Sequence, residues 1–317
     1  MLSRVAEGVF ILNRCIERAE NIARVLDVNL QLELDLPGTG DERWTPILAA
    51  LGDEAPVVGG DVLHHLTCDA GNPNSILSCV RTARDHAASV REILSSECWE
   101  QVGEFCRMVE DAAAHDRVAS APHEFFTAVK KASALFVGVS YLTMSHNEPW
   151  HFGRLGRLLE RADATSRLLA VKVHLHLPEL SDIGSPYDEI LWIAVLKSAS
   201  AFEMYRKAHG RISPRRVAAF LAFDRKFPRS MRYCVVKAER SLHAITGRPI
   251  GSYASQAEQR LGRLRLEMET ADLDEIAERG LQESLSAYQG QLRKVGEAMR
   301  TTFFAPQVKA AGSRRAG

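Results

Sequence analysis

The sequence predicts an all-α fold, a helical bundle of two pseudo-symmetric halves that arose by internal duplication. Two observations predict it. Apolar residues recur with helical spacing along most of the 317 residues, whereas runs that alternate like a strand are short. In addition, the stretch Asn13–Leu30 returns 143 residues later as Gly156–Val173. Such an internal repeat indicates how a fold is organised.

The two copies share the pattern Arg-x-x-Glu-Arg-Ala-acid-x-x-x-Arg-x-Leu without a gap. In each copy, apolar residues form one helical stripe and charged residues form a second stripe beside it. This arrangement suits two helices that bury a common seam and pair charges along its edge. The matched charged residues are Arg14, Glu17, Arg18, Glu20 and Arg24 in the first copy, and Arg157, Glu160, Arg161, Asp163 and Arg167 in the second.

A second block supports the duplication. Residues 61–83 align with residues 216–238 at a shift of 155, and both segments carry Pro, Ser and Cys at the same places. We therefore expect one half at 1–145 and the other at 146–304. The remaining residues, 305–317, are small and basic and should form a disordered tail.

Breakers and caps set the expected helix ends. Pro37-Gly38 ends the first helix, and Asn74 or Ser75 caps the helix after the break at Pro73. Besides the second charged helix, the helices we expect are Val5–Leu36, Trp44–Leu51, Asp61–Thr67, Ile76–Ser95, Trp99–His115, Pro122–Ser145, Tyr253–Thr270 and Leu273–Phe304.

Charge is balanced over the chain but not between its halves. Residues 1–150 hold 12 basic and 22 acidic side chains, and the remainder holds 28 and 18. The halves should attract each other, or the second half should meet an anion. Six scattered cysteines without a CxxC pair indicate reduced thiols in a cytoplasmic protein. Charges interrupt the N-terminal segment, and no uncharged run approaches the roughly 20 residues of a membrane span, so we expect no membrane partner.

The segments MLSRVAEGVF, IERAENIAR, GRLLERAD and FPRSMRYC together resemble the bacterial alpha-E domain family, and the resemblance covers essentially the whole chain. Ile11 and Cys15 stand where the family commonly has aromatic residues, and Asp85-His86 stands where Glu-Asn is common. The resemblance implies a helical protein without an assigned activity of its own. Its members are typically encoded beside, or fused to, circularly permuted ATP-grasp ligases, often with transglutaminase-like proteins. This association with ligases and transglutaminase-like proteins implies a role in ATP-dependent amide or peptide bond formation.

The carboxylate pairs Glu17/Glu20 and Glu160/Asp163 allow three interpretations. The neighbouring arginines could satisfy them in buried ion pairs. A polar cleft, with Asn21 among its residues, could bind the charged ends of an amino acid or peptide. Carboxylates three residues apart on facing helices can also build a dimetal site. Such sites usually include a Glu-x-x-His motif, which neither copy has.

A basic segment, residues 206–240, holds eleven Lys and Arg against two acids. Helix N-termini near Pro214 and Pro228, together with arginines, suit a phosphate or carboxylate ligand or a partner. A charged face that meets solvent or the acidic half is the simpler alternative. Nucleic acid is not expected, because interleaved exposed aromatic residues are absent. The candidates here are Arg211, Arg215, Arg216, Arg225, Arg229, Ser230 and Arg232.

Other catalytic patterns are missing. None of the eleven histidines lies in a metal-binding motif, and there is no GxSxG, Walker loop or GxGxxG. Cys79 and Cys234 occupy equivalent positions of the repeat, which packing explains better than reactivity.

We therefore expect a helical accessory partner of an ATP-grasp amidoligase, one that docks the ligase or presents an amino-acid or peptide substrate. It would bind no cofactor itself, and ATP and Mg²⁺ would lie on the ligase. Two alternatives stay open. The chain could be an enzyme, with Glu17 or Glu160 as acid/base and Arg24 or Arg167 as a substrate clamp, or it could be a pure scaffold. An exposed seam could also pair two copies of the chain.

Overall fold

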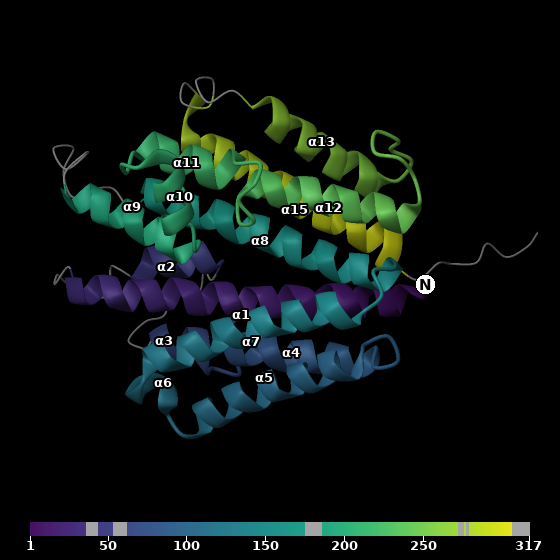
Figure 1. Cartoon of the computed structure of the whole chain (residues 1–317), viewed down its shortest axis with the longest axis horizontal. Helices are drawn as coiled ribbons and strands as arrows, with labels where there is room; N and C mark the ends of the chain where they lie inside the picture. The colour runs from purple at the N-terminus through teal and green to yellow at the C-terminus, as the bar shows by residue number, and fades with distance from the viewer. Residues whose placement is uncertain (36–43, 53–61, 175–185, 272–275, 277–278, 306–317) are drawn as a thin grey trace, which may run out of the picture.

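The computed structural model describes residues 1–35, 44–52, 62–174, 186–271, 276 and 279–305. Every regular element in these ranges is a helix, so the predicted all-α class is confirmed. Two long helices, α1 (Ser3–Asp35) and α8 (Glu148–His174), lie side by side through the middle of the molecule (Figure 1). The remaining helices stack on either side of this central pair.

The central helices run parallel and in register. The N-terminal ammonium of Met1 lies 3.4 Å from a carboxylate oxygen of Glu148 at the start of α8. Further along, Arg161 of α8 contacts Glu17 of α1 at 2.6 Å. Because contacts advance along both helices together, residues of the two repeated segments face each other across one seam.

Small residues let the two backbones approach closely. A Cβ atom added at Gly156 would lie 2.4 Å from the carbonyl oxygen of Phe10, and one at Gly153 would lie 2.5 Å from the side-chain nitrogen of Asn13. Such distances are far shorter than real carbon contacts. Glycine at these positions is therefore a condition for the spacing of the seam.

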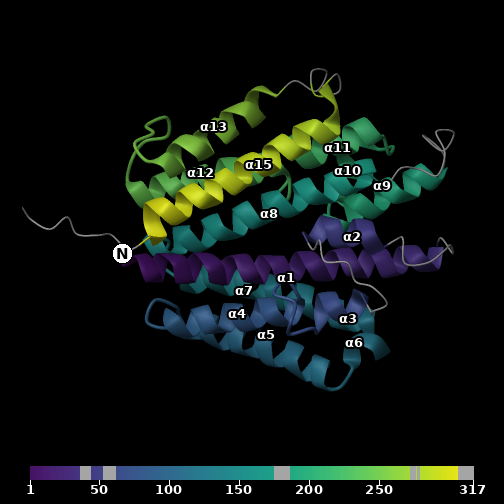
Figure 2. The same ribbon diagram turned by 180° about the vertical axis from the view of Figure 1, so that it is seen from behind.

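The first half packs on α1. Helices α4 and α7 lie against α1, and α5 covers both of them (Figures 1 and 2). Their apolar faces form one hydrophobic core with the buried face of α1. The helices of this half are α2 (Trp44–Leu51), α3 (Val62–Thr67), α4 (Ile76–Ser89), α5 (Ser96–Ala114), α6 (Arg117–Ser120) and α7 (Pro122–Thr143).

The second half packs on α8 in the same manner. Helices α12 and α15 lie against α8, and α13 contacts both of them. A short π-helical turn, η3 (Arg300–Phe304), follows α15, and the ring of Phe304 lies 5.2 Å from the ring of Phe10. The other helices are α9 (Pro186–Ser198), α10 (Phe202–His209), α11 (Pro214–Phe223), α12 (Met231–Thr246), α13 (Gln256–Thr270) and α15 (Leu281–Met299).

Matching local contacts recur in the two halves. Ser75 caps α4 and Ser230 caps α12, each by accepting a backbone N–H three residues on at 3.1 Å. The Cys79 thiol points to the carbonyl of Asn74, and the Cys234 thiol to that of Pro228. The predicted duplication requires contacts of this kind, although it remains a prediction from the sequence.

Several predicted helix ends in the first half need correction. Helix α1 begins at Ser3 rather than at Val5, and α5 spans Ser96–Ala114 rather than Trp99–His115. The helix expected to reach Ser95 ends at Ser89, because the chain turns at residues 90–94 and Ser95 then caps α5. The helix expected to reach Ser145 ends at Thr143. The predicted helix ends at Leu36 and Asp61 lie outside the described residues.

In the second half, α13 begins at Gln256 rather than at Tyr253, because Ser255 and Glu258 form a capping box. The last long helix begins at Leu281, after Gly280 with φ at 98°. The predicted helix residues 273–275 and 277–278, and nearly all of the predicted tail, lie outside the described part of the chain.

Helix α7 alone, among the described helices, is long and apolar enough to cross a membrane by length and composition. The core helix of a soluble protein passes the same test. Leu135, Tyr141 and Leu142 of α7 are exposed. Its other side contacts α1, where Lys130 pairs with Asp27.

We expect Gly156→Ala to lower the free energy of unfolding by about 1–3 kcal/mol, because its methyl group would collide with the Phe10 carbonyl. Gly138→Ala is the control, since a Cβ there meets no atom within 4 Å. That change should be neutral or stabilising by up to about 1 kcal/mol. Urea denaturation measures both, and equal effects would contradict close packing at the seam.

Candidate functional site

The two central helices exchange ion pairs at the middle of the seam. Arg161 of α8 donates to both carboxylate oxygens of Glu17 at 2.7 and 2.6 Å. In return, Arg18 of α1 donates to Glu160 at 2.6 and 3.1 Å, and Arg14 donates to the same carboxylate at 2.8 Å. The predicted seam of matched acids and arginines is thus present, and each copy neutralises the other.

One side of the seam, the side of Glu17, is filled by a residue from the second half. Arg229, in the loop before α12, donates to Glu17 at 3.3 Å and to the side-chain oxygen of Asn21 at 2.9 Å, and it also pairs with Glu20. Glu20 accepts from Arg24 and from Ser133 of α7 as well. This side of the seam therefore holds the guanidinium groups of three arginines around the two buried carboxylates of Glu17 and Glu20.

The arginines keep the central acids ionised. Burial by itself would raise the pKa of Glu17, but Arg161 and Arg229 together lower it to about 2. Burial opposes ionisation of Glu160 in the same way, and Arg18 and Arg14 lower its pKa to about 2. Both carboxylates are consequently charged and fully engaged at neutral pH.

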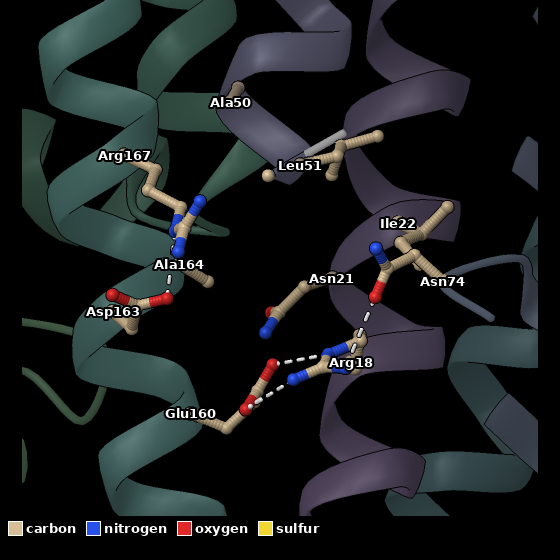
Figure 3. Close-up of a pocket in the computed structure, with 11 residues that line it drawn as sticks. Arg18, Asn21, Ile22, Ala50, Leu51, Asn74, Glu160, Asp163, Ala164 and Arg167 are labelled. Atoms are coloured by element: carbon tan, nitrogen blue, oxygen red, sulfur yellow. Dashed lines mark hydrogen bonds and ion pairs between the residues drawn. The ribbon is translucent and has the colours of Figure 1, made fainter. Parts of the chain in front are cut away.

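The opposite side of the seam, the side of Glu160, is open. A cavity of about 90 Å³ lies between α1, α8, α2 and the start of α4 (Figure 3). Its volume corresponds to roughly three water molecules at liquid density. The polar residues that line it are Arg18, Asn21, Asn74, Glu160, Asp163 and Arg167.

Asn74 lines the cavity with a short side chain. In the predicted alignment of the two halves, it stands where the second half has Arg229. Its amide oxygen accepts from Arg18 at 3.2 Å, whereas the longer side chain of Arg229 reaches Glu20. Sequence reasoning overlooked this position, although the alignment of residues 61–83 with 216–238 contained the signal.

Helix α2 covers one side of the cavity. Gly52 follows it with φ at 75°, and a Cβ there would lie 2.4 Å from the guanidinium of Arg167. Arg167 in turn donates to Asp163 at 2.8 Å. Glycine at position 52 thus leaves room for the arginine that holds Asp163 in place.

Asn21 presents an unused donor to the cavity. Arg229 is a donor only, so its bond to the Asn21 oxygen fixes the orientation of the amide. The side-chain nitrogen is buried and lacks a hydrogen-bond partner, and Figure 3 shows the side chain above the Glu160–Arg18 pair, pointing from α1 toward α8. A buried donor of this kind favours a ligand that brings an acceptor.

The carboxylate of Asp163, which also lines the cavity, lacks full charge compensation. Burial raises its pKa, and Arg167 only partly offsets that effect. Among the four acids of the two matched pairs, Glu17/Glu20 and Glu160/Asp163, it alone is contacted by a single arginine. A donor from a ligand would stabilise its charged form.

Among the predicted seam residues, Arg157 stands apart. It is half-buried and forms no ion pair with any described residue. Burial and the nearby charge of Arg161 lower its pKa to about 10. Its role as a binding residue stays a prediction.

The basic segment does not form one site. Only Arg229 reaches the seam, which supports the expectation that the segment meets the acidic first half. Ser230 cannot serve a ligand as predicted, because it is fully buried and caps α12. Five predicted members lie at or near the surface, away from the seam contacts: Arg211, Arg215, Arg216, Arg225 and Arg232.

Metal and thiol chemistry find no support in the described residues. They contain no group of three His, Cys, Asp or Glu side chains that could hold a metal ion. Burial raises the pKa of Cys79, and it raises that of Cys234 to about 12. Both thiols therefore stay protonated and act as packing groups.

Comparison with known families adds the decisive observation. Residues 1–304 match a family model described as a predicted alpha-helical domain with a conserved ER motif, Alpha-E. The chain belongs to the Alpha-E family. In this Alpha-E chain, Glu-Arg pairs at 17–18 and 160–161 form the reciprocal ion pairs of the seam.

Curated relatives of this Alpha-E chain include uncharacterized proteins of Mycobacterium tuberculosis and Mycobacterium bovis. They are 26% identical to it over 94% of its length. The chain spans only 36% of the length of these relatives. No solved structure matches it significantly.

We expect Glu17→Ala to cost about 3–5 kcal/mol of folding free energy, because it leaves Arg161 and Arg229 without their shared carboxylate in a buried site. Glu110→Ala is the control, since it breaks only the more exposed pairs with Arg81 and Arg84 and should cost no more than about 1 kcal/mol. Chemical denaturation measures both. Wild-type stability of Glu17→Ala would exclude a structural role for the seam.

Acid should destabilise the fold in a defined window. The pKa values of Glu17 and Glu160 fall from 4.5 to about 2 on folding, so their stabilisation is complete above pH 4.5 and is lost as the pH falls towards 2. The loss should be on the order of a few kcal/mol. Urea denaturation at stepped pH should show a shallower slope for Glu17→Gln than for the wild type, and parallel curves would contradict the assignment.

Proposed function

We propose that this Alpha-E chain is an accessory helical subunit that holds the charged end of an amino acid or short peptide and presents it to an ATP-grasp amidoligase. One observation carries the binding part of this proposal: the cavity beside Glu160 sets the unused donor of Asn21 against the poorly neutralised carboxylate of Asp163.

A zwitterionic end meets both requirements. Its carboxylate would accept from the Asn21 amide and lie near the guanidinium of Arg18, and its ammonium would donate to Asp163. The small volume favours a chain end without a large side chain in the cavity, with the rest of the ligand outside.

The same geometry favours presentation over catalysis. Glu160 is ionised and paired with two arginines, so it has no proton to give at neutral pH. Glu17 is fully buried and does not line the cavity. Enzymatic acid/base work by these residues, the alternative function, therefore has less support.

The ligase part of the proposal rests on the family resemblance of the sequence. The mycobacterial relatives are longer than this chain, which matches about a third of each. In the proposed system, ATP and Mg²⁺ lie on the ligase, and this chain supplies the oriented substrate end.

Binding can be tested with glycylglycine by calorimetry. We expect the free dipeptide to bind, and N-acetylation or C-amidation to weaken binding about tenfold or more, as loss of a charge-assisted hydrogen bond does. Asn74→Arg should block binding, because the new guanidinium would fill the cavity as Arg229 fills the opposite side of the seam beside Glu17 and Glu20. Asn74→Ala leaves the cavity open and is the matched control. Equal affinities for the two variants would overturn the site.

The partner is tested separately by ATP turnover in mixtures of this chain, amino acids and its cognate ligase. Turnover that needs both proteins, and that Asn74→Arg abolishes, is the expected result. Product formed by this chain alone would show it to be an enzyme. A stable complex without any effect on the ligase rate would show it to be a scaffold.

A further inference from the structure

A second, larger cavity adjoins the first. It shares Arg18, Asp163 and Arg167 with the first cavity, but α15 and η3 enclose it in place of α2. Its volume is about 380 Å³, within the range of small-molecule sites. The proposed presentation of a chain end does not use this space.

The second cavity carries an excess of positive charge. Five arginines line it: Arg14, Arg18, Arg167, Arg293 and Arg300. Against them stand the lining acids Asp163 and Glu297 and the adjacent Glu160, which binds two of the arginines. Two positive charges are left over.

One of the two surplus charges lies on α15 and η3, where Arg293 and Arg300 stand against Glu297. The other lies on α1, where Arg14 and Arg18 share Glu160. Arg167 is held by Asp163. Arg293 and Arg300, by contrast, are exposed and form no ion pair within the described part of the chain. Their guanidinium groups are available to a ligand.

Apolar side chains complete the lining. Phe10 of α1, Leu159 of α8 and Leu292 of α15 line the cavity beside the arginines, and all three are at least nine-tenths buried. A ligand that fills the space would thus contact these apolar groups and place an anion near Arg293 and Arg300.

We propose that this second cavity binds a phosphate monoester that carries an apolar group. A phosphate monoester has a charge of about −1.5 to −2 at neutral pH, which matches the two surplus positive charges. Its three oxygens can accept from the forked guanidinium groups of Arg293 and Arg300. Because the cavities share a wall, a chain end and a phosphate ester would lie on either side of Asp163 and Arg167.

Phenyl phosphate is a suitable probe, with phenylacetate as the singly charged control. In calorimetry at fixed ionic strength, we expect phenyl phosphate to bind more tightly than phenylacetate. Arg293→Ala should weaken phenyl phosphate binding by about tenfold, as removal of a charged hydrogen-bond donor does. Lys294→Ala is the matched control, since the neighbouring side chain lines a different hollow, and it should change the affinity less than about twofold.

Steric block gives a second measurement that does not alter charge. A Cβ at Gly296 or at Gly290 meets no atom within 4 Å, and only Gly296 lines this cavity. Gly296→Phe should abolish phenyl phosphate binding, and Gly290→Phe should not.

Equal losses for Arg293→Ala and Lys294→Ala, or equal affinities for the two probes, would overturn the proposal. Glycylglycine binding by Arg293→Ala should equal that of the wild type. A failure of this site is therefore distinguishable from a failure of the proposed function.

Discussion

The reciprocal pairing of Glu17 with Arg161 and of Glu160 with Arg18 is the constraint on which the rest of the molecule depends. Charges removed from water must be paired, and each of these carboxylates finds a partner on the other central helix. A shift of either helix by one residue would leave buried charges unpaired. The ion pairs thus specify the register of the two halves more than they add net stability.

A difference between the two sides of the seam accompanies the candidate site. Arg229 of the second half fills one side, and Asn74 of the first half stands on the other. The cavity therefore lies on the side where the first half contributes a short amide, and the side that receives the long guanidinium of Arg229 is filled.

The helices and the seam were predictable from the sequence because both depend on local spacing. Apolar periodicity places α1 and α8, and the repeated Glu-Arg pairs place the charges that face each other. The cavities were not predictable in this way. The first depends on the length of one side chain, Asn74, and on how α2 covers it, and the second depends on α15 returning to α8. Ser230 shows the same limit, since its burial as a cap is decided by packing.

The contact between Phe10 and Phe304 joins the first helix of the described chain to its last turn. Ala6 and Phe10 of α1 also belong to the core of the second half. During synthesis, α1 therefore leaves the ribosome long before the residues that complete its burial. Until α15 and η3 are made, α4, α7 and α8 can cover the apolar faces of α1, but Phe10 lacks its contact with Phe304. Completion of this core is consequently a late event in synthesis.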